Sequence, residues 1–401
     1  MANCQGGRDL TDNIKAHNAG VVQRAGVAHR VLAMKTLSSH KSGIDCSAAF
    51  HGTAVPRIAV IVPNRNDSRY LPRCISSILE QEDRPDELIV VDDQSTDNSV
   101  RVVRSLISGH EWARLIENPV NLGTYGALDK GLEASRSEYV LFLSANDFVM
   151  PGLFARARSC LARHPGVGLW SAMGWLVDED DRLIRLHVSP VISLRDAYVP
   201  PERCASLVYR LGNWFVGATL IYHRDTLEAV GKFDPAYMGL ADLVTAWIVA
   251  SRRGAAYSPI PFGVIRIHSG GYLSRTLTGN ANVEAILDRL RERGPLLAPG
   301  LFTKEFLDRM ALRFSFAPVR ASKGANIPHL ASKYPGLRRF ALNGVSRLPP
   351  RFYRARVALT FIVLCPFDVL PALWNRLLGS AVVLVLLRLE GQGTYPPARP
   401  R

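Results

Sequence analysis

The chain has 401 residues, of which 47% are hydrophobic and 21% are charged, a composition that suits packed domains and excludes a globally disordered protein. The 49 Lys and Arg residues outnumber the 35 Asp and Glu residues, and the resulting charge of +14 favours anionic partners such as phosphates, nucleotides, nucleic acid or an acidic membrane face. Six scattered cysteines form no C-x-x-C pair, which argues against a disulfide framework and a structural zinc site and favours a reducing compartment.

Residues 1–55 lack sustained periodicity and are rich in Gly, Ala, Ser, His and Asn, so we predict a disordered arm. After Arg57, short β-branched runs alternate with stretches whose apolar residues recur at helical spacing. The pattern predicts strands at 58–62, 87–91, 115–117 and 139–143, and helices at 70–80, 99–107 and 125–134. This alternation is typical of an α/β domain with a central, mostly parallel sheet, which we place at residues 56–280.

Beyond residue 151 the alternation becomes less regular. The pattern predicts a helix at 153–163, strand-like segments at 167–177 and 218–222 and a helix at 240–253, whereas residues 178–212 are charged and loop-rich.

Residues 281–401 form a third region, in which a basic stretch leads into apolar segments at 357–373 and 377–387. Polar and Pro residues interrupt the first segment and the second has only eleven residues, whereas a membrane-spanning helix needs about 20 apolar residues. Two interpretations of this helical, apolar extension stay open. It is either a hairpin buried against the main domain or a segment that enters an anionic membrane leaflet behind the arginines at 351–356.

Polar side chains follow four predicted strands where each strand ends, in the segments 63–67, 92–97, 118–126 and 144–147. Ligands of an open parallel sheet bind outside the carboxyl ends of its strands, so we predict that these segments line one cleft. The pair Asp92-Asp93 ends a buried strand, where an unpaired charge is costly, and this favours a ligand-binding role. A turn followed by a helix cap is the alternative, and it accounts for the polar residues at 95–97. The glycines at 121–126 fit neither the dinucleotide-binding nor the P-loop fingerprint.

Several motifs, in this order along the chain, resemble those of family 2 glycosyltransferases with the GT-A fold. The matching segments are Val60 to Asn66, Val91 to Asp97, Asn121 to Ala134, Leu143 to Pro151, Asn213 to Asp234, Ala241-Asp242 and Arg266-Ile267-His268. The resemblance covers residues 57–275 and implies a GT-A-type, Rossmann-like domain that transfers a sugar from a nucleotide diphosphate, with inversion, to an acceptor hydroxyl. By this resemblance, the residues that hold the donor nucleotide are Pro63, Asn66, Asp92, Asp93 and Gly123.

The resemblance also implies a divalent metal, Mn²⁺ or Mg²⁺, that neutralises the leaving diphosphate. Its ligands would be Asp147, then Asn146, with His268 as a third. Residues 144–147 read Ser-Ala-Asn-Asp where the family commonly has D-x-D-D, so one carboxylate is present. Mg²⁺ and Mn²⁺ accept a neutral amide oxygen, but fewer charges usually mean weaker binding, and we expect a weak metal dependence.

Asp242 is the expected catalytic base, because a carboxylate within reach of the acceptor hydroxyl can remove its proton. It falls where the family places a Glu-Asp pair, although Ala241 stands in place of the Glu. The alternative is a purely structural carboxylate that interacts with free N–H groups at the start of a helix.

The sequence thus predicts an inverting glycosyltransferase of the hexosyltransferase type, active in polysaccharide or cell-envelope synthesis on a glycan, lipid-linked or envelope acceptor. We expect it in the cytoplasm, membrane-associated at the cytoplasmic face if the C-terminal extension docks there, and without a nucleic-acid partner. Two alternatives stay open. The first is a non-catalytic GT-A-like scaffold that binds nucleotide sugars, which the depleted metal motif favours. The second is a nucleotidyltransferase, which would need a Gly-rich or Lys-bearing phosphate loop that we do not find in the sequence.

Overall fold

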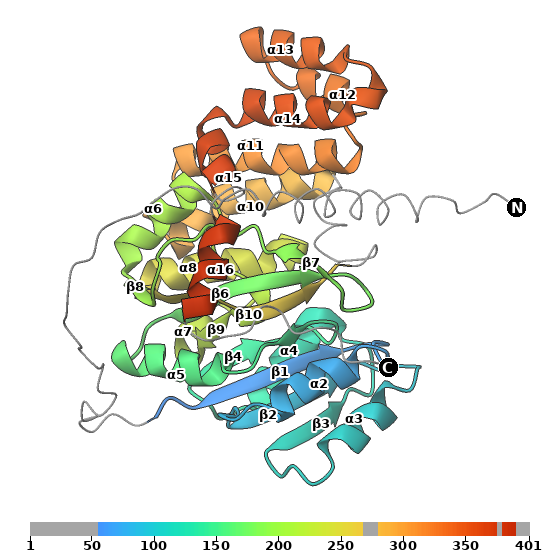
Figure 1. The fold of residues 1–401 in the computed structure, drawn as a ribbon, viewed down its shortest axis with the longest axis vertical. Coiled ribbons are helices and arrows are strands. Elements are labelled where there is room, and N and C mark those ends of the chain that lie inside the picture. Colours follow the sequence, from blue (N-terminus) through green and yellow to red (C-terminus); the bar gives the residue numbers. More distant parts are fainter. Residues whose placement is uncertain (1–54, 268–279, 375–378, 390–401) are drawn as a thin grey trace, which may run out of the picture. The chain divides into compact units, whose positions relative to one another are not determined.

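The computed structural model describes residues 55–267, 280–374 and 379–389 (Figure 1). Apart from Val55, the predicted N-terminal arm therefore lies outside the described residues.

A single mixed sheet forms the centre of the chain, with the strand order β3-β2-β1-β4-β9-β6-β10-β5, while β7 pairs with β6 and β8 with β10. The strands are β1 (Ile58–Asn64), β2 (Glu87–Asp92), β3 (Ala113–Glu117), β4 (Tyr139–Phe142), β5 (Phe148–Val149), β6 (Leu169–Val177), β7 (Leu183–Leu186), β8 (Ala197–Val199), β9 (Ile221–His223) and β10 (Ala255–Arg266). Strands β3, β2, β1 and β4 are parallel, and so are β6 and β10. Strand β9 is antiparallel to both of its neighbours, β4 and β6.

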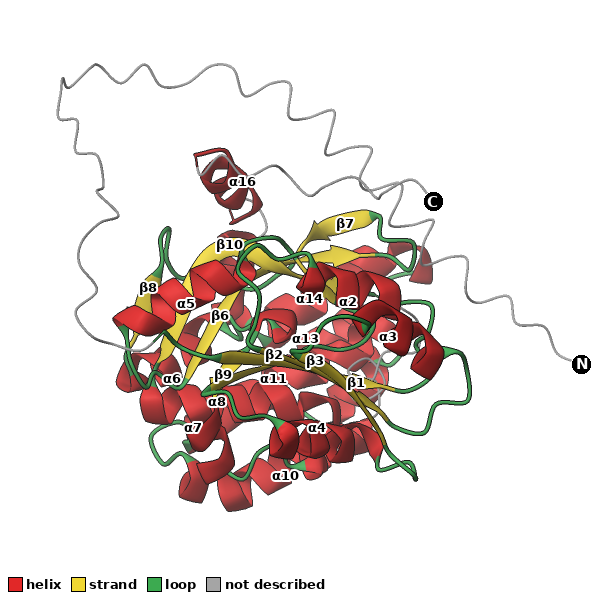
Figure 2. Cartoon of the chain, turned by 90° about the horizontal axis from the view of Figure 1, so that it is seen from below, coloured by secondary structure: helices red, strands yellow, loops and turns green. Residues whose placement is uncertain are grey.

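Helices cover both faces of this sheet, which explains why β1 and β2 are apolar along almost their whole length. The helices of this part are α2 (Leu71–Leu79), α3 (Ser99–Ile107), α4 (Gly123–Ala134), α5 (Leu153–Arg163), α6 (Pro201–Leu211), α7 (Arg224–Ala229) and α8 (Ala241–Arg253). Figure 2 shows α2, α3 and α5 on one side of the sheet and α4, α7 and α8 on the other. Gly131 allows α4 to approach β1 closely, because a Cβ at that position would lie 2.3 Å from the Ile61 side chain.

The strand register brings the predicted site segments to one edge of the sheet. Asn64, the last residue of β1, pairs with Asp92, the last residue of β2, and Ile61 pairs with Phe142 near the end of β4. Since these strands are parallel, the loops that follow β1, β2 and β4 leave the sheet at the same edge.

The C-terminal region is helical, as predicted. It comprises α10 (Asn280–Leu297), α11 (Lys304–Ala321), α12 (Ile327–Ser332), α13 (Gly336–Ser346), α14 (Tyr353–Leu364), α15 (Val369–Trp374) and α16 (Ser380–Leu389). Helices α10 and α11 contribute to the main core, while Leu342 of α13 and Leu364 of α14 belong to a second, smaller core. Val383 and Leu387 of α16 are buried in the main core, so part of the apolar extension packs on the domain. No helix among the described residues is both long and apolar enough to cross a membrane.

Several elements of the sheet region differ from the sequence-based expectation, and among them β5, β7, β8 and α7 were not predicted. Strand β10 was not predicted, because Pro259 and Pro261 interrupt it, and the register with β6 shifts on both sides of Pro261. Helix α6 occupies part of the segment 178–212, which we expected to be loop-rich. Two tryptophans that could stack on a sugar, Trp170 and Trp214, are fully buried in the core.

Candidate active site

Asp92 fastens the end of β2 to the end of β1. The carboxylate is buried and accepts hydrogen bonds from Asn64 Nδ2 at 2.6 Å and from the Ser95 backbone N–H at 2.9 Å, one on each oxygen. The Ser95 hydroxyl in turn accepts from the Asn66 backbone N–H at 2.9 Å. Asp92 therefore holds the two loops together, and this role explains a buried carboxylate without a ligand.

Asn66 continues the same contact between the loops. Its side-chain Oδ1 accepts from the Thr96 backbone N–H at 2.7 Å. The residue has φ of 59°, the left-handed region that Asn tolerates better than most residues. Pro63, one residue before the end of β1, pairs with Val91 of β2, so both predicted nucleotide residues of this segment lie beside the β2 loop.

Asp93 connects the β2 loop to the start of α4. Its Oδ1 accepts from Asn118 Nδ2 at 2.9 Å and from the Leu122 backbone N–H at 2.8 Å. No donor in the part of the chain that the structure describes is paired with Oδ2, which leaves this oxygen for a ligand. Gly123 follows at φ of 74°, so the chain turns sharply into α4 directly beside Asp93.

Asp147 lies at the same edge, on the loop between β4 and β5. Its Oδ1 accepts from the Arg266 backbone N–H at 2.9 Å. Burial raises the pKa of the carboxyl to about 7, since the Arg266 charge lowers the pKa only in part and Asp67 raises it further. A buried carboxylate with a raised pKa has too few positive neighbours, and a bound cation would supply the missing charge.

The described residues fit a divalent metal only in part. Asp147 would hold the ion through Oδ2, because Oδ1 accepts the hydrogen bond from Arg266, and the Asn146 side chain could add a neutral amide oxygen. His268, the third predicted ligand, lies outside the described residues. Among residues 55–267, 280–374 and 379–389, no group of three His, Cys, Asp or Glu side chains could hold a metal ion. Most oxygens of a bound ion would therefore come from the nucleotide and from water.

Arg266 is a site residue to which the sequence reasoning assigned no role. Its side chain is 2% exposed and forms an ion pair with Asp181 and a hydrogen bond to the Asn146 backbone carbonyl. The guanidinium also lies over the Tyr70 ring, with its carbon 4.5 Å from the centroid. Arg266 therefore fixes the backbone of the predicted metal segment. The signal in the sequence was the segment Arg266-Ile267-His268, which matches a motif of the family.

Asp242 lies in the first turn of α8, and its backbone carbonyl accepts from the Tyr222 hydroxyl at 3.0 Å. Its Oδ1 accepts from the Leu243 backbone N–H at 2.8 Å, and Oδ2 would be 3.5 Å from a Cβ placed on Gly217. Gly217 precedes β9, whose first residue, Ile221, pairs with Leu141 near the carboxyl end of β4. Asp242 thus lies at the edge that carries Asp93 and Asp147.

The environment of Asp242 suits a base. The residue is exposed, yet the surrounding protein atoms desolvate its carboxyl and raise its pKa above the ordinary value, while the N–H of Leu243 lowers it. A raised pKa makes the carboxylate a stronger proton acceptor than an ordinary aspartate. The hydrogen bond from the Leu243 N–H also fits the structural alternative. The geometry is therefore compatible with a catalytic base and with a carboxylate that stabilises the start of α8.

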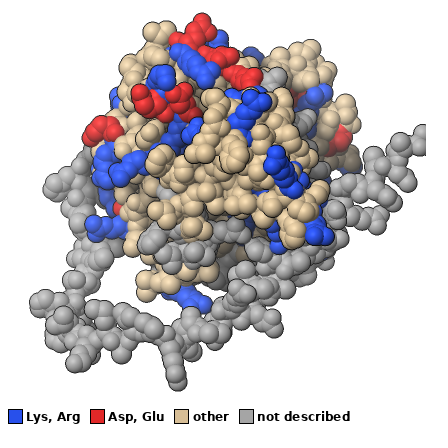
Figure 3. Space-filling view, turned by 90° about the horizontal axis from the view of Figure 1, so that it is seen from above, with Lys and Arg blue, Asp and Glu red and all other residues tan. Residues whose placement is uncertain are grey.

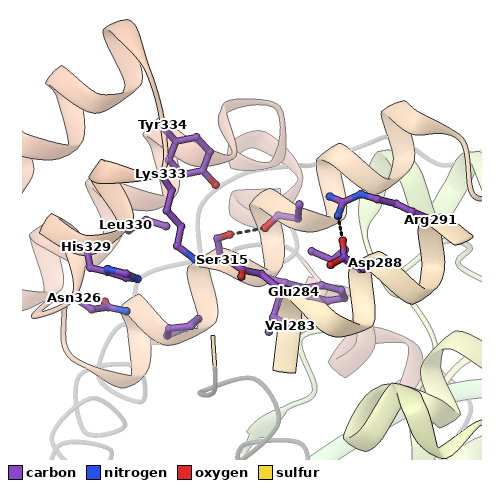
Figure 4. Close-up of a pocket in the computed structure, with 14 residues that line it drawn as sticks. Val283, Glu284, Asp288, Arg291, Ser315, Asn326, His329, Leu330, Lys333 and Tyr334 are labelled. Atoms are coloured by element: carbon purple, nitrogen blue, oxygen red, sulfur yellow. Dashed lines mark hydrogen bonds and ion pairs between the residues drawn. The ribbon is translucent and has the colours of Figure 1, made fainter. Parts of the chain in front are cut away.

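Two cavities lie away from this edge. One, of about 390 Å³, is formed by α10, α11 and the α12 region, where Lys333 pairs with Glu284 and Arg291 with Asp288 (Figure 4). The other, of about 260 Å³, is lined by residues of α11, α13 and α14 and by the segment 365–368. None of the predicted site residues lines either cavity, so the candidate site stays at the strand ends.

Comparisons with known proteins agree with the sequence resemblance. The model of "Glycosyl transferase family 2" matches residues 59–170. An uncharacterized glycosyltransferase of Nostoc sp. is 34% identical over 185 residues, which is 45% of this chain and 54% of the relative. A "PGL/p-HBAD biosynthesis glycosyltransferase" of Mycobacterium bovis is 28% identical over 112 residues, 28% of this chain and 44% of the relative. The chain spans about half the length of the curated relatives it matches.

Two solved structures are similar at low identity. A mannosyltransferase from Pyrobaculum calidifontis in complex with GDP-Man and Mn²⁺ has a TM-score of 0.49 and 22% identity, and covers 79% of this chain and 88% of its own. TarS of S. aureus with UDP-GlcNAc has a TM-score of 0.49 and 17% identity, and covers 84% of this chain and 93% of its own. The family match rests on the sequence, and it contains the β1, β2 and β4 loops with Asp93 and Asp147. Residues 59–170 are thus similar to glycosyl transferase family 2.

Proposed function

We propose that the chain is an inverting glycosyltransferase that uses a nucleotide-diphosphate sugar. The observation that carries the proposal is the position of Asp93, Asp147 and Asp242 at one edge of the sheet, on a chain with a family 2 segment. A donor nucleotide bound by Asp93 Oδ2 would place its diphosphate between the β2 and β4 loops, beside Asp147. The GT-A arrangement that the sequence resembles uses the same strand ends.

The transfer is a single displacement. The acceptor hydroxyl oxygen attacks the anomeric carbon, the bond from that carbon to the diphosphate oxygen breaks, and the nucleoside diphosphate leaves with the electron pair. The proton of the acceptor hydroxyl passes to the Asp242 carboxylate. Attack from the face opposite the leaving group inverts the anomeric configuration. A divalent metal, when bound, neutralises the charge that develops on the diphosphate.

Residues of the chain position these groups. Asp147 would hold the metal through Oδ2, and Arg266 keeps the Asn146–Asp147 backbone in place through two hydrogen bonds. Asp92 and Asn66 hold the β1 and β2 loops together, so the nucleotide meets a site that is already formed.

We place the acceptor among glycans and lipid-linked or envelope precursors, and the enzyme in the cytoplasm and peripheral to the membrane. The name of the mycobacterial relative, a glycosyltransferase of PGL/p-HBAD biosynthesis, supports an envelope role. The four described cysteines, all buried and free, agree with a reducing compartment.

The experiment is a screen of nucleotide sugars for binding and for release of nucleoside diphosphate, with and without Mn²⁺. We expect one donor to bind, to be turned over in the presence of an acceptor, and to respond weakly to the metal. The small number of metal ligands among the described residues favours a second candidate function, a scaffold that binds nucleotide sugars without transferring the sugar. Binding without turnover on any acceptor would select the scaffold, and no binding of any donor would refute both.

A further inference from the structure

Several large apolar side chains in the C-terminal region are almost fully exposed, and four of them come in two pairs. Leu337 and Phe340 of α13 are 82% and 77% exposed, while Phe367, in the 3₁₀ turn Pro366–Asp368 before α15, and Leu370 of α15 are 80% and 78% exposed. Single exposed apolar residues are common on any protein surface. Four side chains with this degree of exposure within two short helical segments form a feature that needs a partner.

These side chains form two pairs, Leu337 with Phe340 and Phe367 with Leu370, which together we call the apolar face. Leu337 and Phe340 are three residues apart on a helix and therefore neighbours on one side of it, and the same spacing separates Phe367 from Leu370. Arg338, next to Leu337, lines the same cavity of about 260 Å³ as Phe367, so the segments that carry the two pairs border one hollow.

The chain segment that carries the apolar face is rich in arginine, while the exposed Glu305 and Asp308 of α11 line the cavity beside Phe367. Residues 334–389 contain eight arginines and one acidic residue, Asp368. Asp368 is buried and paired with Arg309 and Arg313, so it offers little negative charge at the surface. Six of the arginines are exposed, and none of the six forms an ion pair within the described ranges; they are Arg338, Arg339, Arg347, Arg351, Arg354 and Arg388.

Figure 3 views the molecule from the end that carries α12, α13 and α14. It shows a broad area without charged side chains, with groups of Lys and Arg along its border and the Asp and Glu side chains gathered toward one side. An apolar centre with a basic border is complementary to a layer of anionic headgroups over acyl chains.

We propose that the apolar face docks on the surface of an anionic lipid bilayer. The apolar side chains would enter the boundary between headgroups and acyl chains, while the arginines would bind the phosphate groups of the lipids. The described helices are too short or too polar to span, so they would lie on the leaflet. Neither contact involves the residues assigned to donor, metal or acceptor proton.

The test is co-flotation of the full chain with vesicles of phosphatidylcholine alone and with vesicles that also contain phosphatidylglycerol. We expect flotation with the anionic vesicles only, and its loss at high salt, because salt screens the arginine contacts. Replacing Arg338 and Arg339 by Gln should lower the partition coefficient about fivefold for each charge removed.

Apolar substitutions with a matched control test the face itself. The triple variant Phe340→Ser, Phe367→Ser and Leu370→Ser should lower partitioning at least about tenfold. The control, Val188→Ser, Leu194→Ser and Leu296→Ser, removes exposed apolar side chains (63%, 63% and 80% exposed) that lie outside the apolar face and should float like wild type. All six residues are exposed, so both proteins should keep the wild-type melting temperature.

Three results would overturn the proposal. They are no flotation with either kind of vesicle, equal losses in the two triple variants, and self-association through the apolar face, seen as a dimer that the first variant converts to a monomer while flotation is absent. Transfer to a soluble acceptor is measured separately. Since the two functions use different residues, a failure of docking leaves the proposed transfer intact, and a failure of transfer leaves docking intact.

Discussion

Replacing Asp242 by Asn separates a catalytic base from a structural carboxylate. In the wild type, the Leu243 N–H lies 2.8 Å from Asp242 Oδ1. An Asn side chain has nearly the same volume and an oxygen that can accept this hydrogen bond, but it cannot take a proton from the acceptor hydroxyl. A positioned base contributes about 10²-fold or more, so kcat should fall by at least that factor, which corresponds to about 2.7 kcal/mol of transition-state stabilisation. The affinity for the nucleoside diphosphate should stay unchanged.

The pKa of Asp242 predicts the effect on stability and on the pH profile. Because desolvation by the surrounding protein atoms raises the pKa of Asp242 in the folded protein above its unfolded value, the folded state loses stability as the pH rises through that folded pKa. The Asn variant should therefore melt at the same or a higher temperature at neutral pH. In the wild type, kcat/KM should decline on the acid side at a higher pH than an ordinary aspartate would cause, and this decline should vanish in the variant.

The assay is release of nucleoside diphosphate, with the melting temperature measured on the same preparations. Asp225→Asn is the matched control, because Asp225 is an exposed carboxylate in the first turn of α7. Unchanged turnover in Asp242→Asn would refute the reasoning and assign Asp242 to the helix end alone. A loss of turnover together with a lower melting temperature would point to the same structural role.

Three other substitutions test other parts of the structure. Asn146→Asp should tighten Mn²⁺ binding in a metal titration, because a second carboxylate would join Asp147, and an unchanged titration would place the ion elsewhere. Asp93→Asn should weaken binding of the nucleoside diphosphate about tenfold by calorimetry, as the charge on Oδ2 is lost; wild-type affinity would remove Asp93 from the donor site. Glu87→Gln should cost about 1–3 kcal/mol in urea unfolding at pH 7. Desolvation tends to raise the Glu87 pKa, but hydrogen bonds from Ser137, Arg136 and Arg114 outweigh it and lower the pKa, so this cost should disappear as the pH falls through the folded pKa; a cost that persists in acid would contradict the assignment.

The sequence predicted most of the parallel half of the sheet because each of its strands is a local pattern. The bounds predicted for β1 and β2 from their β-branched runs, and for α5 and α8 from their apolar spacing, are close to the observed bounds. Strand β10 could not be predicted in this way, since its prolines oppose a strand and pairing with β6, β5 and β8 stabilises it. Tertiary contacts, and not local sequence preference, determine that this segment forms a strand.

The same distinction applies to the candidate site. The sequence analysis treated Asp92 and Asp93 as a pair. The structure distinguishes them: both oxygens of Asp92 accept hydrogen bonds from the two loops, whereas the hydrogen bonds to Asp93 are all accepted by Oδ1. Arg266 is 119 residues from the partner of its backbone N–H, and no spacing rule connects residues so far apart. Motifs with short spacing were therefore accessible from the sequence, whereas their distant supports were not.

The pairing of β5 with β10 has a consequence for how the protein is made on the ribosome. Strand β5 pairs with β10 at Gly263 and Val264, and the N–H that fixes Asp147 belongs to Arg266, 119 residues later in the chain. At a synthesis rate of about 5–20 residues per second, the loop of Asp147 waits on the order of ten seconds for its partner. During that interval β4 also lacks β9 and presents an open strand edge. The nascent chain can form its first four parallel strands early, but the centre that we propose for catalysis closes only after β10 has emerged.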